Sequence, residues 1–353
     1  MNIRNAYLTA ALLIWPQLAL SQPPQPAPPK VPAVAPEDAD QLEETQLVHG
    51  VTVSVRVYGK DLAGAPAVAQ AAIREIARIY DKFDLHTRES EASAINKAAD
   101  REEVLVSEET FQLLTRMLDL CRRSNGAYDP TVASYDFLWN FSIRPFVRPL
   151  ADEIAVRRKM TGCDKLILKP GNHAVRTATP GTRVTFAGVL HGFAMERASE
   201  VLRKASINDF RIRIGNDVFA QGRVGTRHWL TAAPNTRKPD GEALQVYLTS
   251  QAAVTVSDTD HFVFRNGKRY HDGIDPRTGL PVEGVIQATV IGTDPTMTGA
   301  MARALFVLGP KAGLAMLAHD KQAEGFLVDA TGKIWASPAM AEYAHLPAKM
   351  PID

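Results

Sequence analysis

A run of strand-like segments between residues 210 and 291 constrains the fold of this chain more than any other feature. Short apolar or alternating stretches follow one another there, at 210–214, 218–221, 229–232, 245–248, 253–256, 261–264 and 287–291. Helical patterns flank this run on both sides. Consecutive strands mixed with helices are typical of the α+β class. We therefore expect one α+β domain with mixed or antiparallel sheets and packed helices.

The flanking helical patterns are amphipathic. A strand with period-two alternation at 52–58 precedes them, and the predicted helices span 65–83, 107–123, 193–205, 297–308 and 311–319. The last two are joined at Gly309-Pro310. The helix at 193–205 is opened by Gly192, and its N-terminus would present free backbone N–H groups and a positive dipole end. That end suits a phosphate group.

The overall composition excludes two classes of protein. The chain has 353 residues, of which 45% are hydrophobic, so it is long and apolar enough to bury a core and is not disordered throughout. Its 40 basic residues balance 39 acidic ones, and they form no basic block. Nucleic acid is therefore not an expected partner.

The first 21 residues are typical of an export signal. Arg4 gives a positive start, residues 6–20 are largely apolar, and Ala19-Leu20-Ser21 is an acceptable small-residue cleavage site. The alternative is a membrane anchor, but Pro16 interrupts an apolar run shorter than the roughly 20 residues of a spanning helix. We expect an exported, periplasmic, soluble protein with no membrane span after signal cleavage.

A proline-rich segment follows the signal. Seven prolines fall within residues 23–36, which favours an extended, solvated spacer. We place a linker at 22–45 and the domain at 46–345. The two cysteines, Cys121 and Cys163, could pair in an oxidising compartment, but they fall on a predicted helix and a predicted loop, and the pattern favours two separate buried thiols. Neither lies near the cleavage site, where a cysteine would accept a lipid.

The segment Ile274-Asp275-Pro276-Arg277-Thr278-Gly279-Leu280-Pro281 packs an Asp, two prolines and a glycine into eight residues. Proline fixes φ, and Asp and Gly favour tight turns, so the segment should form a rigid loop. A rigid loop can position a ligand.

This loop resembles the H-I-I-D-P-x-T-G-x-P signature of the ApbE family, the FAD:protein FMN transferases. Three other segments resemble family motifs in the same order. They are the Ser90-Glu91-Ala92-Ser93-Ala94-Ile95-Asn96 loop, the Gly126-Ala127-Tyr128-Asp129-Pro130-Thr131-Val132 loop, and Gly188-Val189-Leu190-His191-Gly192-Phe193-Ala194. Together the resemblance spans roughly residues 46 to 320.

The resemblance implies FAD as the ligand and Mg²⁺ as a possible metal. Such enzymes cleave the pyrophosphate of FAD and join FMN to a Thr or Ser hydroxyl of a target flavoprotein. Ala127, Tyr128 and Asp129 match the loop of the family that contacts the flavin. The alternative for this loop is a structural turn, in which Asp129 caps the backbone and Tyr128 lies in the core.

Other expected flavin contacts differ from the family pattern. His49 stands where relatives carry Met, His86 where many carry Tyr, Thr185 where they carry Asp, and His191 where they often carry Lys. A lone histidine is more often a satisfied surface or core residue, and these show no metal-ligand spacing. His191 remains a candidate contact because it precedes the phosphate-suited helix start.

The metal positions of the family are not retained. Its helix offers an Asp and, four residues later, a Thr on one face, and these positions are Gly299 and Arg303 here. Gly188 could lend a carbonyl, and a carboxylate such as Asp272 or Asp294 could contribute. Arg303 either lies on a solvated helix face or occupies the place of Mg²⁺ and pairs a ligand phosphate.

The signature histidine is also displaced. Counting back from Asp275, its position holds Asp272, and the actual histidine is His271, on the opposite face of a strand unless a bulge intervenes. Both are weak candidates for a catalytic group. Two hypotheses follow: an exported FAD:protein FMN transferase, or an impaired, metal-independent flavin-binding homologue that serves as an accessory or binding protein.

Overall fold

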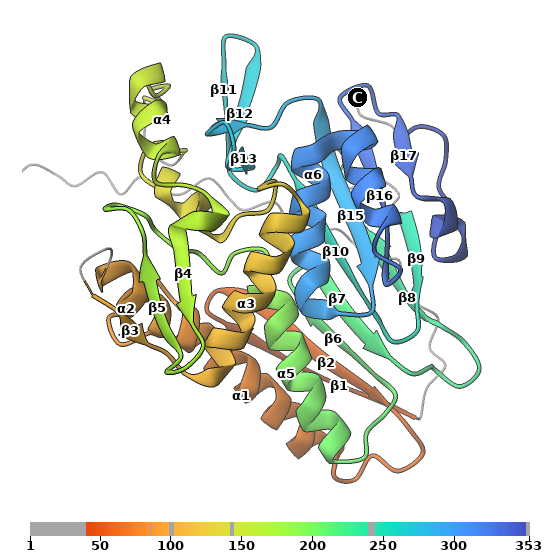
Figure 1. Ribbon diagram of the computed structural model, residues 1–353. Coiled ribbons are helices and arrows are strands. Elements are labelled where there is room, and N and C mark those ends of the chain that lie inside the picture. Colours follow the sequence, from red (N-terminus) through yellow and green to blue (C-terminus); the bar gives the residue numbers. More distant parts are fainter. Residues whose placement is uncertain (1–39, 86, 99–101, 142–144, 239–243, 351–353) are drawn as a thin grey trace, which may run out of the picture.

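An eight-stranded antiparallel sheet forms the centre of the computed structural model, which describes residues 40–85, 87–98, 102–141, 145–238 and 244–350 (Figure 1). The predicted signal, most of the linker and His86 lie outside the described residues. The strand order is β1-β2-β6-β7-β10-β15-β16-β17. Their bounds are Gln41–Val48, Val51–Tyr58, Phe210–Ile214, Asp217–Gln221, Gln251–Ser257, Val285–Gly292, Ala323–Asp329 and Ile334–Ala336.

Four long helices cover one face of this sheet. Helices α1, α5 and α6 pack against the strands and against one another, and α3 packs on α6 (Figure 1). The helices of the described chain are α1 Ala65–Phe83, α2 Glu91–Ala98, α3 Glu108–Arg123, α4 Ala151–Arg158, α5 Leu190–Lys204 and α6 Pro295–Ala318. The apolar stripe of α1, from Ala69 to Phe83, is buried as its spacing predicts.

The opposite face of the sheet is covered by the hairpin of β8 (Trp229–Ala233) and β9 (Leu244–Leu248) and by the C-terminal segment around Met340. Because both faces are covered, every residue of β15 is buried. This explains why β15 does not alternate: apart from the buried polar residues Gln287 and Thr289, it is a run of apolar and small residues. The expected α+β class is confirmed.

Smaller units complete the fold around this sheet and its helices. They are a three-stranded sheet of β3 (Val104–Leu105), β5 (Ala174–Thr177) and β4 (Leu166–Lys169), the hairpin of β11 (Phe262–Arg265) and β12 (Lys268–His271), the short pair β13 (Ile274–Asp275) and β14 (Leu280–Pro281), and the 3₁₀ turns η1 (Pro130–Tyr135), η2 (Cys163–Lys165) and η3 (Pro338–Glu342).

The structure differs from the sequence expectations at three places. Strand β1 begins at Gln41, inside the segment assigned to the linker, and pairs along its length with β2. The segment 90–96, expected to be a loop, is largely helix α2. Helix α5 begins at Leu190 rather than Phe193, because Gly188, with φ +88°, ends the preceding turn and the amide of Phe193 donates to the carbonyl of Val189.

Helix α6 contains the predicted break. Gly309 adopts φ +72° ahead of Pro310, so the two predicted helices are separate in geometry although they are continuous in the ribbon. By length and composition α6 is apolar enough to cross a membrane, but half of its most apolar stretch is buried in the domain against β10, β15 and β16. That burial is the pattern of a core helix.

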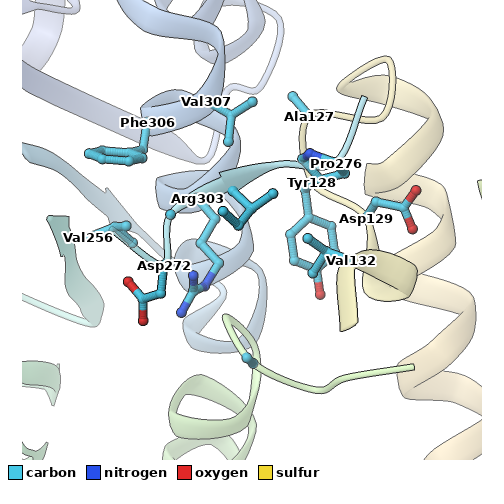
Figure 2. A pocket seen from close by; sticks show the side chains of 13 residues that line it. Ala127, Tyr128, Asp129, Val132, Val256, Asp272, Pro276, Arg303, Phe306 and Val307 are labelled. Atoms are coloured by element: carbon cyan, nitrogen blue, oxygen red, sulfur yellow. The ribbon is translucent and has the colours of Figure 1, made fainter. Parts of the chain in front are cut away.

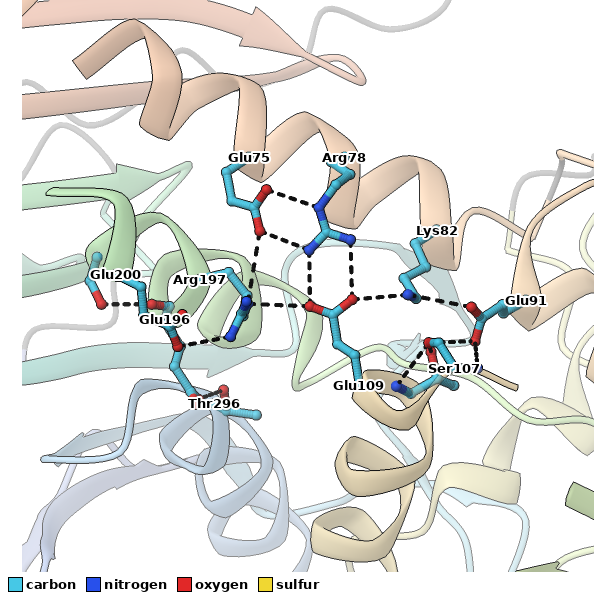
Figure 3. A network of polar contacts seen from close by, with 12 residues as sticks. Glu75, Arg78, Lys82, Glu91, Ser107, Glu109, Glu196, Arg197, Glu200 and Thr296 are labelled. Atoms are coloured by element: carbon cyan, nitrogen blue, oxygen red, sulfur yellow. Dashed lines mark hydrogen bonds and ion pairs between the residues drawn. The ribbon is translucent and has the colours of Figure 1, made fainter. Parts of the chain in front are cut away.

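An ionic network ties the helices together (Figure 3). Arg78 of α1 pairs with Glu75 at 2.7 Å and with Glu109 of α3 at 2.9 Å, Lys82 reaches Glu109 at 2.9 Å, and Arg197 of α5 reaches it at 3.2 Å. Burial raises the pKa of Glu109, but the hydrogen bonds from Arg78 and Lys82 outweigh it and lower that pKa to about 2. Glu109 is therefore the centre of the network.

Candidate functional site

A pocket opens where the loop after α3, the Gly188 turn and the signature loop meet helix α6 (Figure 2). Its lining combines aromatic and aliphatic side chains with three charged ones. The residues are Ala127, Tyr128, Asp129, Val132, Ala187, Val256, Asp272, Gly273, Ile274, Pro276, Arg303, Phe306 and Val307. An apolar pocket with a few convergent polar groups is the usual form of a small-molecule site.

The signature loop is rigid, as its composition predicts. Within it, the carbonyl of Asp275 accepts a 2.8 Å hydrogen bond from the amide of Gly279. From outside, Tyr135 of η1 donates to the carbonyl of Pro276 at 3.1 Å, and the indole of Trp139 donates to the carbonyl of Gly279 at 2.8 Å. Two buried aromatic side chains thus fix the loop that forms one wall of the pocket.

The loop from Gly126 to Asp129 forms the facing wall. Gly126 takes φ +74°, which favours glycine, and its amide donates to the carbonyl of Cys121 at 2.8 Å. Ser124 accepts a hydrogen bond from the amide of Tyr128 at 3.1 Å. The Tyr128 side chain is 3% exposed, and its buried hydroxyl has no hydrogen-bond partner among the described residues.

Asp129 has a structural role as well as a place in the pocket wall. Its Oδ1 accepts hydrogen bonds from the amide and the hydroxyl of Thr131, both at 2.7 Å, and so caps η1. Burial raises the pKa of Asp129 to about 6. Asp129 therefore caps the backbone through Oδ1, as the structural-turn alternative predicts. Tyr128 lies in the core and also lines the pocket.

The expectation of two separate thiols was wrong. Cys121 of α3 and Cys163 of η2 form a disulfide, with their Cα atoms 5.9 Å apart. The chain between them folds back on itself, and the amide of Gly162 donates to the hydroxyl of Thr131 at 2.8 Å. The two sulfur atoms lie near Asp129 with metal-like spacing, but sulfur atoms in a disulfide are not thiolate ligands. This group is therefore not a metal site.

The two metal positions of the family do converge, around Gly188. A Cβ atom on Gly299 would clash with the carbonyl oxygen of Gly188, and a Cβ on Gly188 would lie 2.6 Å from Cδ of Arg303. Gly299 offers no side-chain oxygen, and a guanidinium cannot ligate Mg²⁺ and repels it. Asp294 is occupied, since it caps α6 and pairs with Arg116 at 2.7 Å. These residues do not fit a magnesium ion.

Arg303 instead extends its side chain into the pocket, between Tyr128 and Asp272 (Figure 2). It is partly buried, and no hydrogen bond or ion pair holds its guanidinium within the described chain. Arg303 therefore lines a pocket and does not lie on a solvated helix face; phosphate pairing stays a prediction. An unpaired guanidinium in a pocket is a ready partner for an anion.

Asp272 and His271 point to opposite sides, as the one-residue displacement predicts. His271 is 3% exposed, its Nε2 contacts the carbonyl of Val282 at 2.8 Å and its Nδ1 accepts from the amide of Gly273 at 3.2 Å. Burial lowers the pKa of His271. With both ring nitrogens engaged in the core, His271 is not available to a ligand, whereas Asp272 lines the pocket.

Sequence reasoning missed His261 on the neighbouring hairpin. Its Nδ1 lies 3.0 Å from Oδ2 of Asp272, and its backbone carbonyl accepts the Asp272 amide at 3.0 Å. The hydrogen bond with Asp272 raises the pKa of His261. No motif identified this residue, because only the antiparallel register of β11 and β12 brings it beside Asp272.

His49 and His191 form a second cluster, outside the pocket lining. His49 Nε2 pairs with Asp81 at 2.8 Å, and His191 Nδ1 pairs with Asp217 at 2.7 Å. The ring of Tyr80 lies between them, with centroid distances of 5.5 Å to His49 and 6.0 Å to His191. His191 lies in the first turn of α5, not before the helix, and its imidazole is partnered by Asp217.

Thr185 supports the pocket without lining it. Its amide donates to the carbonyl of Pro130 at 2.8 Å, and its hydroxyl accepts from the amide of Ala187 at 3.1 Å. These bonds place Ala187 and then Gly188 against α6. The structure therefore brings together Ala127, Tyr128, Asp129, Asp272 and Arg303 around one pocket, with Gly188 beneath Arg303.

Known proteins resemble this chain in both sequence and structure. The ApbE family model matches residues 49–327. The FAD:protein FMN transferase of Treponema pallidum is 26% identical over 86% of this chain and 88% of its own length. A FAD:protein FMN transferase of Klebsiella pneumoniae is 27% identical over 79% of this chain and 86% of its own length. The ApbE protein of Thermotoga maritima superposes with a TM-score of 0.78 at 26% identity, covering 87% of this chain and 100% of that one. The chain therefore belongs to the ApbE family.

Proposed function

We propose that this protein is a FAD:protein FMN transferase, which binds FAD and transfers FMN to a Thr or Ser hydroxyl of a target flavoprotein, releasing AMP. One observation carries the proposal: the family's loops enclose a pocket into which Arg303 extends a guanidinium that has no hydrogen-bond or ion-pair partner within the described chain. A ligand that joins an aromatic ring system to a pyrophosphate would pack against the apolar lining and pair with that guanidinium.

Arg303 is the group we assign to the pyrophosphate. Its guanidinium can form two parallel hydrogen bonds to phosphate oxygens and stays charged at any physiological pH. Gly188, two residues before α5, lies beside Arg303, and no side chain caps that helix. The amides of Val189 and Leu190 donate to the carbonyl of Phe186, but the dipole of α5 still adds a positive partial charge at this end. Because Arg303 already supplies a cation, we expect FAD binding without magnesium.

Equilibrium dialysis with FAD, with and without EDTA, tests the binding step. We expect binding that EDTA does not weaken. Arg303→Ala should weaken it about 10- to 100-fold, the loss of one charge-assisted pair of hydrogen bonds. Arg74→Ala, on the exposed face of α1, is the matched control and should leave affinity unchanged. Equal affinities of the two variants would remove Arg303 from the pyrophosphate site.

The transfer step needs a separate experiment. The protein is incubated with FAD and a target carrying an acceptor threonine, and covalent flavin is read by in-gel fluorescence, with and without Mg²⁺. Fluorescent target protein supports the transferase. The second candidate, a flavin-binding accessory protein without transfer activity, is favoured by Gly299 and Arg303, which remove the family's metal ligands. FAD binding without any covalent flavin would establish that second function instead.

We also propose that the protein is exported to the periplasm and acts there as a soluble protein. The N-terminal pattern supports export, and the disulfide between Cys121 and Cys163 agrees with an oxidising compartment. Cell fractionation followed by N-terminal sequencing tests this. A mature chain starting at Gln22 in the periplasmic fraction is the expected result, and a cytoplasmic protein that retains its first 21 residues would contradict it.

A further inference from the structure

Two residues, His261 just before β11 and Asp272 just after β12, form a histidine–aspartate pair, and Asp272 lines the pocket. We infer that His261, held by Asp272, takes the proton from the acceptor hydroxyl during transfer of FMN. This inference rests on the proposed transferase function and assigns its proton acceptor. It names a catalytic residue, His261, and a positioning residue, Asp272.

The geometry of the pair leaves one ring nitrogen free. Nδ1 of His261 faces Oδ2 of Asp272 at 3.0 Å, and among the described residues no hydrogen bond or ion pair engages Nε2. A carboxylate that accepts the Nδ1 proton fixes the tautomer in which Nε2 is an acceptor. Asp272 itself lines the pocket beside Arg303 (Figure 2). The free nitrogen thus belongs to a histidine whose hydrogen-bond partner, Asp272, borders the proposed phosphate site.

The exposure of the pair suits a protein substrate. The His261 side chain is 69% exposed and that of Asp272 is 44% exposed, so an acceptor residue on another protein can reach Nε2 from solvent. By contrast, both nitrogens of His271 are engaged in the core, and Oδ1 of Asp129 caps η1. His191, paired with Asp217, lies outside the pocket lining. Of these groups, His261 is the imidazole that combines access with proximity to the pocket.

The chemical step balances without any additional reactant. The proton of the acceptor Thr or Ser hydroxyl moves to Nε2 of His261. The hydroxyl oxygen forms a bond to the phosphorus of the FMN half of FAD, and the bond from that phosphorus to the bridging oxygen breaks. AMP leaves with the electron pair of that bond. Asp272 stabilises the imidazolium, which then releases its proton to solvent and is ready for another cycle.

The charges around His261 set the direction of the pH dependence. Asp272 raises the pKa of His261 through its hydrogen bond, burial lowers it, and the charge of Asp260 raises it again. Asp260 lies near Arg303 and Asp217 as well, and its own pKa is raised by desolvation and by Asp272. Because the proton acceptor must be neutral, transfer should accelerate as the pH rises through the pKa of His261, above 6.5.

The experiment compares His261→Gln with His319→Gln, an exposed histidine at the far end of α6. Single-turnover transfer to a threonine target is followed from pH 5.5 to 9, and FAD affinity is measured in parallel. His261→Gln should transfer about 100-fold more slowly, with a flat pH profile and unchanged FAD affinity. Asp272→Asn should move the inflection of the profile to lower pH, and His319→Gln should match the wild-type protein.

Several results would overturn the inference. If His261→Gln transfers within about threefold of the wild-type rate, His261 is not the proton acceptor. A wild-type profile whose inflection persists in His261→Gln would assign the titration to another group. If the wild-type protein transfers no FMN at all, the proposed function and this inference fail together. Only that last pattern refutes the transferase itself.

Discussion

Reduction of the disulfide should destabilise this protein and loosen the loop that faces the pocket. Cys121 lies at the end of α3, where its carbonyl accepts the amide of Gly126. Cys163 begins η2, next to Gly162, which is bonded to Thr131. The disulfide therefore joins the two segments that hold the loop from Gly126 to Asp129. A water-soluble phosphine added to the folded protein reduces the disulfide.

The size of the effect follows from the length of the closed loop. The two cysteines are 42 residues apart in sequence, and the chain-entropy relation for a loop of that length gives about 4 kcal/mol at 25 °C. Because the unfolding entropy grows with chain length, a domain of this size should lose roughly 6 °C in Tm for that loss of free energy. Loosening of the Gly126–Asp129 loop should also lower FAD affinity.

Urea unfolding of oxidised and reduced protein measures the change in free energy, and thiol titration in denaturant verifies the redox state. No thiol should be detected before reduction and two after it. Cys121→Ala combined with Cys163→Ala is the control, since the phosphine should not alter its midpoint. Two free thiols in the unreduced protein, or equal midpoints for oxidised and reduced protein, would refute the role assigned to this disulfide.

Two further substitutions test the packing of α6 and the helix network. Gly299→Ala, which in an open helix would stabilise, should here destabilise by about 1–3 kcal/mol because the new Cβ meets the carbonyl of Gly188. Thermal unfolding measures the change, and Gly171→Ala, at a position with free space for a Cβ, is the control. A Tm of Gly299→Ala above that of the wild-type protein would contradict the clash. Glu109→Gln should remove stability on the order of 2 kcal/mol near pH 7. Because the pKa of Glu109 is lowered, its contribution to stability is present above about pH 4.5 and is lost as the pH falls towards 2. The free energies of unfolding of wild type and variant should therefore converge in acid. A difference that stays constant with pH would show that the ionised Glu109 is not its source.

The helices and the central strands could be predicted because local periodicity reports their buried faces. Helix α1 runs from Ala65 to Phe83, as the apolar spacing predicts. Strand β1 was not predicted because most of its side chains are exposed or half-buried. Even Leu47 is 73% exposed, so the sequence shows no apolar face for this strand. The register of an edge strand is supplied by its neighbour β2 rather than by its own pattern.

Contacts between distant segments could not be predicted in the same way. The disulfide depends on a turn near Gly162 that brings Cys163 back to α3, and sequence spacing carries no measure of that distance. His261 and Asp272 meet only because a hairpin aligns β11 with β12. The face of Asp272, however, followed directly from strand alternation once His271 was recognised as displaced by one residue.

Gly299 and Arg303 stand where the family carries its metal-ligand side chains, so the other groups of the site must contribute more to catalysis. A guanidinium carries one positive charge and can bind a pyrophosphate, but it has no vacant orbital with which to polarise a phosphoryl oxygen as a metal does. A transferase built on Arg303 would therefore retain substrate affinity and depend more heavily on activating the acceptor hydroxyl. His261 and Asp272 lie where that activation is needed. Loss of metal ligands and gain of an exposed histidine–aspartate pair are thus compatible with one function, and EDTA resistance combined with strong pH dependence is the behaviour that such a site must show.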